Sequence, residues 1–67
     1  MIPPAIQQAW LRKTVRRRAR ERRGLVVELQ WKRGRCFARV RWHGADGQPD
    51  YFRQAEAVAI RELEVVG

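Results

Sequence analysis

The clearest pattern in the chain is an alternation of apolar and polar residues that begins at Gly24. The alternating apolar positions are Leu25, Val27, Leu29 and Trp31 in a first run and Cys36, Ala38, Val40 and Trp42 in a second. A period of two is typical of strands with one buried face. Between the runs, residues 32–35 include Gly34, which can adopt the positive φ of a tight turn. The pattern predicts an antiparallel hairpin whose two apolar faces, both tryptophans included, form the core.

The first 23 residues admit two interpretations. In the first, a helix runs from about Pro4 to about Arg22 and stops at Gly24, because Ile6, Ala9 and Trp10 follow helical spacing. In the second, a short helix ends near Trp10 and a strand follows over residues 11–18. We favour the long helix, because residues 11–18 lack the apolar alternation of a half-buried strand.

The second half of the chain predicts shorter elements. Residues 44–50 have turn chemistry throughout, and Tyr51, Phe52 and Arg53 are interpreted as a third short strand. Residues 54–58 are expected to connect this strand to a turn at Arg61 and Glu62. A last strand is expected over residues 64–66. The fold class is therefore mainly β, with a basic and helical N-terminal segment over residues 1–23 and a β domain over residues 24–67.

The number and placement of charges add the strongest functional indication. The chain has 67 residues and a net charge of +8, and eight of the twelve residues at 12–23 are basic. Residues 12–41 carry thirteen basic and two acidic side chains (+11), and residues 42–67 carry two basic and five acidic ones (−3). Such a polarised molecule favours oriented docking on an anionic partner.

Cysteine use and hydropathy limit the other classes of function. Cys36 is the only cysteine, so the chain has neither an internal disulfide nor the cysteine and histidine cluster of a structural metal site. The lone thiol fits a reducing, cytoplasmic setting, and no apolar run approaches the length of a membrane span. A Cys36–His43 nucleophile pair is arithmetically possible, but Cys36 lies where an alternating strand requires a small apolar residue. We expect neither enzymatic activity nor a cofactor.

Residues 24–67 resemble the small SH3-like barrels found in KOW and Tudor-like modules. The resemblance rests on Gly-Leu-Val-Val at 24–27, Ala-Arg-Val-Arg-Trp at 38–42, Tyr-Phe at 51–52 and Ala-Ile-Arg-Glu-Leu-Glu-Val-Val at 59–66. It implies either such a barrel or an open antiparallel sheet capped by the N-terminal helix. Proteins of this class bind nucleic acids, ribosomal surfaces, peptides or acidic electron carriers of the ferredoxin type, so the resemblance indicates fold more than activity.

The leading hypothesis is a module that binds the phosphate backbone of DNA or RNA with little sequence preference. Arginine suits phosphate because it combines charge with paired hydrogen bonds. The candidate contacts are Arg12, Lys13, Arg16, Arg17, Arg18, Arg20, Arg22, Arg23, Lys32, Arg33, Arg35, Phe37, Arg39 and Arg41. Phe37 stacks on a base in this hypothesis, although it can equally pack beneath the N-terminal helix.

A protein–protein adaptor is the alternative hypothesis. In that case the chain docks on an acidic protein surface, such as a ferredoxin or part of a ribosomal or transcription assembly. Trp10 and Phe37 are then apolar anchors within a rim of arginines. Trp10 has a second interpretation, in which it attaches the helix to the sheet. His43 is expected to be a solvated residue at the end of a strand.

Overall fold

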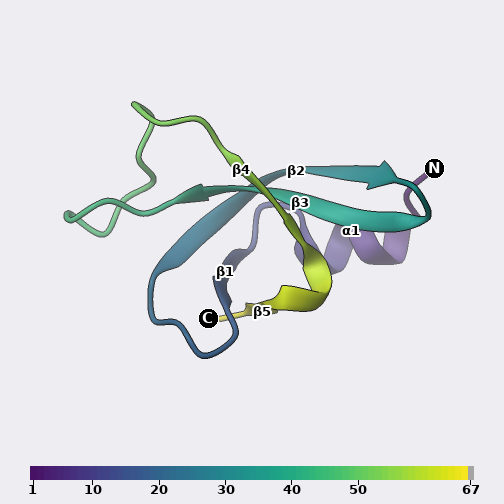
Figure 1. Cartoon of the computed structure of the whole chain (residues 1–67), viewed down its shortest axis with the longest axis horizontal. Helices are drawn as coiled ribbons and strands as arrows, with labels where there is room; N and C mark the ends of the chain where they lie inside the picture. Colours follow the sequence, from purple (N-terminus) through teal and green to yellow (C-terminus); the bar gives the residue numbers. More distant parts are fainter. Residues whose placement is uncertain (67) are drawn as a thin grey trace.

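Five antiparallel strands and one short helix make up the protein, seen here in a computed structural model that describes residues 1–66 (Figure 1). The elements are α1 (Pro4–Trp10), β1 (Thr14–Arg17), β2 (Arg23–Lys32), β3 (Arg35–Trp42), β4 (Glu56–Ala59), the 3₁₀ turn η1 (Ile60–Glu62) and β5 (Leu63–Val65). They form one open sheet in the order β4-β3-β2-β1-β5. The prediction of a mainly β, open antiparallel sheet with an N-terminal helix is confirmed.

The long helix predicted to run to about Arg22 is wrong, because α1 ends at Trp10 and β1 follows. Arg12 takes a φ of 61°, and its backbone N–H donates to the carbonyl of Val26 at 2.9 Å. A longer helix would also place like charges four residues apart, as at Arg12 and Arg16, which is unfavourable. As a strand, the segment buries Val15 completely between β2 and β5.

The β2–β3 hairpin is confirmed, and its turn has the predicted chemistry. Lys32 pairs with Arg35, and the two residues between them, Arg33 and Gly34, have φ values of 54° and 75°. Positive φ at both central positions is the geometry that matches the twist of a two-residue hairpin.

The predicted core face of β2 is only partly right, because a β-bulge lies between Val26 and Glu28. The bulge shifts the alternation by one residue, so Val26 is fully buried opposite Val40 while Val27 is 39% exposed. Beyond the bulge, Leu29 lies opposite Ala38, in the predicted phase. Trp31 keeps that phase too, but it is 48% exposed at the end of the strand, so its assignment to the core was wrong.

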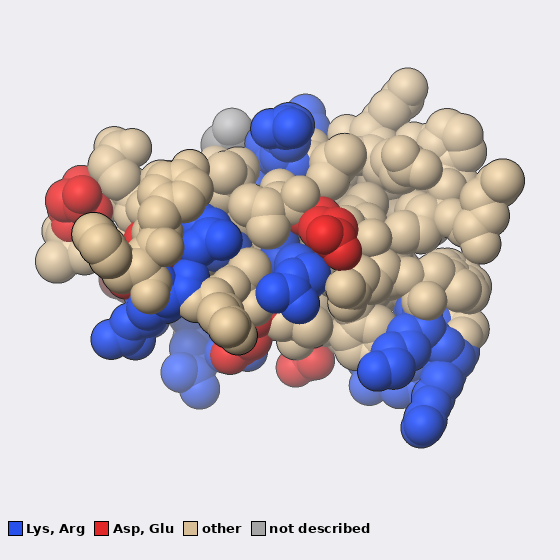
Figure 2. Space-filling model, turned by 90° about the horizontal axis from the view of Figure 1, so that it is seen from above, with Lys and Arg blue, Asp and Glu red and all other residues tan. Residues whose placement is uncertain are grey.

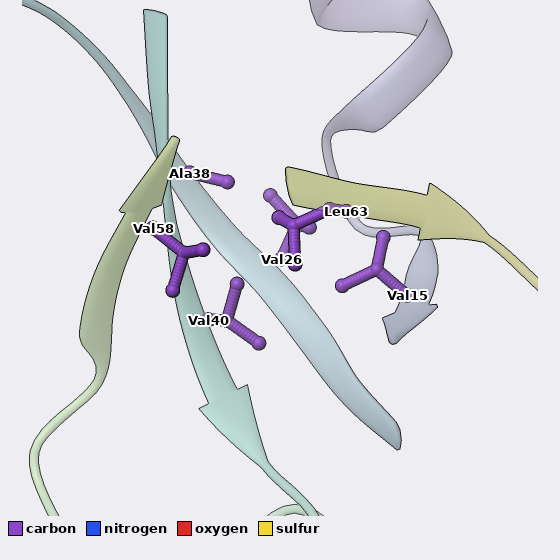
Figure 3. Close-up of a cluster of buried hydrophobic side chains, with 6 residues drawn as sticks. All are labelled: Val15, Val26, Ala38, Val40, Val58 and Leu63. Carbon is purple, nitrogen blue, oxygen red and sulfur yellow. The ribbon is translucent and has the colours of Figure 1, made fainter. Parts of the chain in front are cut away.

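The hydrophobic core lies in the curve of the sheet and draws on all five strands (Figure 3). Its buried members are Val15, Val26, Ala38, Val40, Val58 and Leu63, with Trp10, Leu29, Trp42 and Ile60 packed against them. Gly24 in β2 has no side chain and so leaves room for the side chains of Val40 and Trp42. A Cβ there would lie 2.5 Å from a methyl group of Val40 and 2.8 Å from the ring of Trp42, so the strands can approach this closely only at glycine.

The sheet is curved, because the single 3₁₀ turn η1 connects its two edge strands, β4 and β5. β4 ends at Ala59, η1 follows immediately, and β5 begins at Leu63, one residue before the strand predicted at 64–66. β5 pairs with β1, and the backbone N–H of Arg18 donates to the carbonyl of Glu62 at 3.0 Å. The loop between β1 and β2 is thereby held against η1.

A long loop over residues 43–55 connects β3 to β4 and projects from one end of the molecule (Figure 1). The strand predicted at Tyr51–Arg53 is wrong, since these residues form an exposed turn. The fourth strand of the sheet instead begins at Glu56, within the segment expected to be a connection. Within residues 1–66 there is no helix with the length and apolar character needed to span a bilayer.

Candidate nucleic-acid interface

Arginines from three parts of the chain gather where the β1–β2 loop meets η1. A hollow of about 650 Å³ is lined there by Arg17, Arg18, Arg20, Arg61 and Glu62. Arg17 ends β1, Arg18 and Arg20 belong to the loop, and Arg61 lies in η1. Besides its backbone bond to Glu62, Arg18 donates from Nε to the carbonyl of Arg61 at 3.1 Å, so the loop is fixed in place.

A second, smaller hollow of about 160 Å³ shares Arg17 and Arg20 with the first and has an aromatic ring in its wall. It is lined by Arg17, Arg20, Arg22, Trp42 and Glu56. The guanidinium carbon of Arg17 lies 5.3 Å from the centre of the Trp42 ring, within the range of cation–π attraction. Trp42 Nε1 donates to Glu56 Oε2 at 3.3 Å, and Arg17 forms an ion pair with the same oxygen. Arg17, Arg18, Arg20, Arg22, Arg61 and Trp42 are called the arginine site below.

The charge of the arginine site is only partly balanced by the protein itself. Five arginines face two carboxylates, those of Glu56 and Glu62. Within residues 1–66, Arg18, Arg20 and Arg61 take part in no ion pair, whereas Arg17 is paired with Glu56. The surplus of positive charge in a concave surface attracts anions.

Other residues of the predicted basic run lie outside this site. Arg12 and Lys13 are exposed between α1 and β1. Arg16 points to the other face of β1, where its Nε lies 2.6 Å from Glu64 Oε1. Arg23 begins β2 and lines, with Arg22, a further hollow of about 500 Å³.

The second basic cluster lies at the far end of β2, at the tip of the hairpin. Lys32, Arg33, Arg35 and the half-buried Phe37 line a hollow of about 550 Å³ there. Ten residues of β2 separate this tip from the β1–β2 loop, a length of roughly 30 Å at strand rise. Figure 2 accordingly shows the basic side chains in separate groups on the face it presents, and not as one continuous surface.

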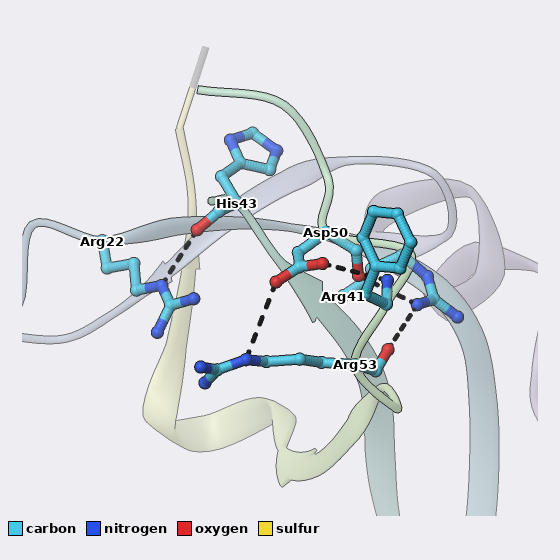
Figure 4. Close-up of polar contacts among 6 residues, drawn as sticks. Arg22, Arg41, His43, Asp50 and Arg53 are labelled. Carbon is cyan, nitrogen blue, oxygen red and sulfur yellow. Dashed lines mark hydrogen bonds and ion pairs between the residues drawn. The ribbon is translucent and has the colours of Figure 1, made fainter. Parts of the chain in front are cut away.

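Arg39 and Arg41, which are predicted to extend a phosphate-binding patch, both donate hydrogen bonds to the β3–β4 loop. Arg39 donates from Nη2 to the carbonyl of Ala55 at 3.2 Å. Arg41 donates from Nη1 to the carbonyls of Asp50 and Arg53 at 3.1 and 2.6 Å (Figure 4). Its guanidinium also lies 5.0 Å from the centre of the Tyr51 ring. The alternation of β3 placed them correctly on the outer face, but it gave no sign that a loop folds back over them.

Trp10, the proposed partner anchor, is half-buried and packs against the hydrophobic core. That position agrees with its second interpretation, attachment of the helix to the sheet. Trp42 is also half-buried against the core, and Glu56 accepts from its ring N–H, as a buried tryptophan requires.

Cys36 is 7% exposed, and burial raises the pKa of its thiol above the ordinary 9.0. A nucleophilic cysteine needs a lowered pKa, because the thiolate is the reactive form, so the raised pKa of Cys36 disfavours such a role. Because the fold favours the protonated thiol, its stabilising contribution is fully present below pH 9.0 and is lost as the pH rises from there through the raised pKa of the folded state.

We therefore expect native Cys36 to react with iodoacetamide at pH 8 far more slowly than free cysteine. In urea the rate should rise to that of the free amino acid, because unfolding exposes the thiol. The rates are measured by mass spectrometry of the alkylated protein. A native rate equal to that of free cysteine would contradict the burial described here.

Trp42 and Arg61 belong to the site, and Glu56 lines it, although sequence reasoning did not place these residues there. Arg61 is more than forty residues from Arg18 along the chain, and only the pairing of β5 with β1 brings the two together. Within residues 1–66, no cluster of histidine, cysteine and carboxylate side chains could hold a metal ion. Comparison of the chain with models of protein families, with curated proteins and with solved structures finds no match.

Proposed function

We propose that the chain is a non-enzymatic module that binds the phosphate backbone of nucleic acids through the arginine site. The observation that carries this proposal is the convergence of five arginines from β1, the β1–β2 loop and η1 on two adjoining hollows beside Trp42. Guanidinium groups bind phosphate oxygens through charge and paired hydrogen bonds. Only two carboxylates line the two hollows, so most guanidinium N–H groups there are available to a phosphate.

Sequence preference is expected to be slight. Phosphate contacts fix position on the polymer but carry no information about the bases. No helix of the described chain is suited to entering a major groove, since α1 has seven residues and packs through Trp10 on the core. The hairpin tip, with Lys32, Arg33 and Arg35, supplies a secondary contact for a long polymer.

The alternative partner, an acidic protein surface, has less support. Trp10, the apolar anchor proposed for that partner, packs against the protein's own core. We further propose a distant relation to the SH3-like class, supported by the strand order and by the 3₁₀ turn before the last strand. A cytoplasmic location is part of the same proposal and rests on the lone, buried thiol.

The test is a titration of a fluorescently labelled oligonucleotide followed by anisotropy at low salt. We expect dissociation constants in the micromolar range for oligonucleotides of unrelated sequence, as is usual for binding through the backbone. Poly-glutamate of equal total charge should compete poorly. Equal competition by poly-glutamate would point to an acidic protein, and no change in anisotropy would contradict nucleic-acid binding.

A further inference from the structure

Two aromatic side chains on the β3–β4 loop are exposed to solvent. Tyr51 is 72% exposed and Phe52 is 102% exposed. A small domain has few such residues without a use, because exposed aromatic surface favours association. The phosphate contacts of the arginine site do not account for this feature.

The loop is ordered by the protein before any partner binds. Arg41, on the outer face of β3, donates to the carbonyls of Asp50 and Arg53 and lies against the Tyr51 ring. The backbone N–H of Phe52 donates to Asp50 Oδ1 at 2.9 Å. The backbone that carries both aromatic rings is therefore held by Arg41 of β3 and by a turn within the loop, which lowers the entropy cost of binding through these rings.

The same loop is fastened to the arginine site where it leaves β3 (Figure 4). Arg22 donates from Nε to the carbonyl of His43 at 3.0 Å, and the N–H of His43 donates to the carbonyl of Arg23 at 2.9 Å. The hollow of about 500 Å³ beside these bonds is lined by Thr14, Arg22, Arg23, His43, Gly44 and Gly47. Arg22 and Arg23 thus lie beside the start of the loop. The far part of the loop carries Arg53, whose side chain is 79% exposed and whose Nε lies 3.7 Å from Asp50 Oδ2.

We propose that the preferred ligand is single-stranded nucleic acid, with Phe52 stacking on an unpaired base while Arg22, Arg23 and Arg53 bind the flanking phosphates. This inference rests on the proposed function and names its class of ligand. An aromatic ring can stack only on a base whose face is free, and in a duplex both faces of each internal base are covered by neighbouring pairs. Stacking of this kind tolerates any base sequence, which agrees with a site that lacks base-specific donors.

The test compares one sequence as a single strand and as a duplex, with wild-type protein and with variants at position 52. Wild-type protein should bind the single strand more tightly than the duplex. Phe52→Ala should lower affinity for the single strand by about tenfold, within the range of base–aromatic stacking, and leave the duplex unchanged. Phe52→Trp should keep the preference, and Phe52→Leu should behave like Phe52→Ala because leucine is apolar without a ring.

The controls separate this inference from a loss of fold and from the proposed function. The Phe52 side chain is fully exposed, so thermal unfolding followed by circular dichroism should not change in Phe52→Ala. Trp31→Ala removes an exposed aromatic at the other end of β2 and should leave the preference intact. Equal loss for both ligands in Phe52→Ala, or full affinity in Phe52→Leu, would overturn the stacking role. If wild-type protein binds neither ligand, the proposed function fails as well.

Discussion

Leu63→Ala is expected to lower the free energy of unfolding by about 3 kcal/mol, within the range for a buried leucine truncated to alanine. Leu63 is 1% exposed and begins β5, the strand that fastens β1 and the arginine site to the core. A chain of this length has a total stability of roughly 3–10 kcal/mol, so the loss is a large share. Thermal unfolding followed by circular dichroism should show a fall in Tm of roughly 12–24 °C.

Val65→Ala on the same strand is the matched control. Val65 is 46% exposed, and its truncation should cost less than about 1 kcal/mol because it leaves no cavity. Similar losses in the two variants would mean that β5 does not bury Leu63 as described. The arrangement of η1 and the β1–β2 loop would then also be wrong.

The triple variant Arg18→Gln, Arg20→Gln, Arg61→Gln is expected to lose roughly a hundredfold or more in affinity for nucleic acid near 0.1 M salt. Each phosphate contact contributes about 0.9 to the slope of log K against log salt for a duplex, which is worth close to one log unit at that concentration. The three side chains take part in no ion pair within residues 1–66, so their removal leaves no carboxylate partner without its cation. Anisotropy titrations of a labelled oligonucleotide measure the loss.

The control for this prediction removes the same amount of charge from residues 12–16, outside the arginine site. Arg12→Gln, Lys13→Gln, Arg16→Gln takes away three cations that lie outside the arginine site, one of which, Arg16, is paired with Glu64. A loss of only a few-fold is expected, because the net charge falls equally but the hollows stay intact. If both triple variants lose affinity alike, binding depends on net charge alone and the site has no role.

The hairpin and the final turn could be predicted from the sequence because local signals determine them. Alternation fixed the extent of both hairpin strands, and Gly34 marked the turn. The bulge after Val26 could not be predicted, because Val26 and Val27 are equally apolar and only the position of Val40 across the strands decides which is buried. The strand at Thr14–Arg17 falls within the second interpretation of residues 11–18, which was correct. It was not favoured for a similar reason, since a single buried residue, Val15, gives no visible period.

The arginine site was predicted in part, because charge is visible in a sequence while its distribution in space is not. The basic run did contribute Arg17, Arg18, Arg20 and Arg22 to one site. Arg61 and Trp42 belong to the site, with Glu56 beside them, because of pairings between strands that are separated in the chain. Arg39 and Arg41, which look identical to the others in the sequence, support a loop whose path depends on tertiary contacts.

The most direct test of phosphate binding by the arginine site is the salt dependence of binding to a duplex oligonucleotide. With about four of its arginines on phosphates, log K for wild-type protein should fall against log salt with a slope of about −4. The triple variant of Arg18, Arg20 and Arg61 should show a slope close to −1. A wild-type slope near zero, or one that the triple variant leaves unchanged, would contradict the account.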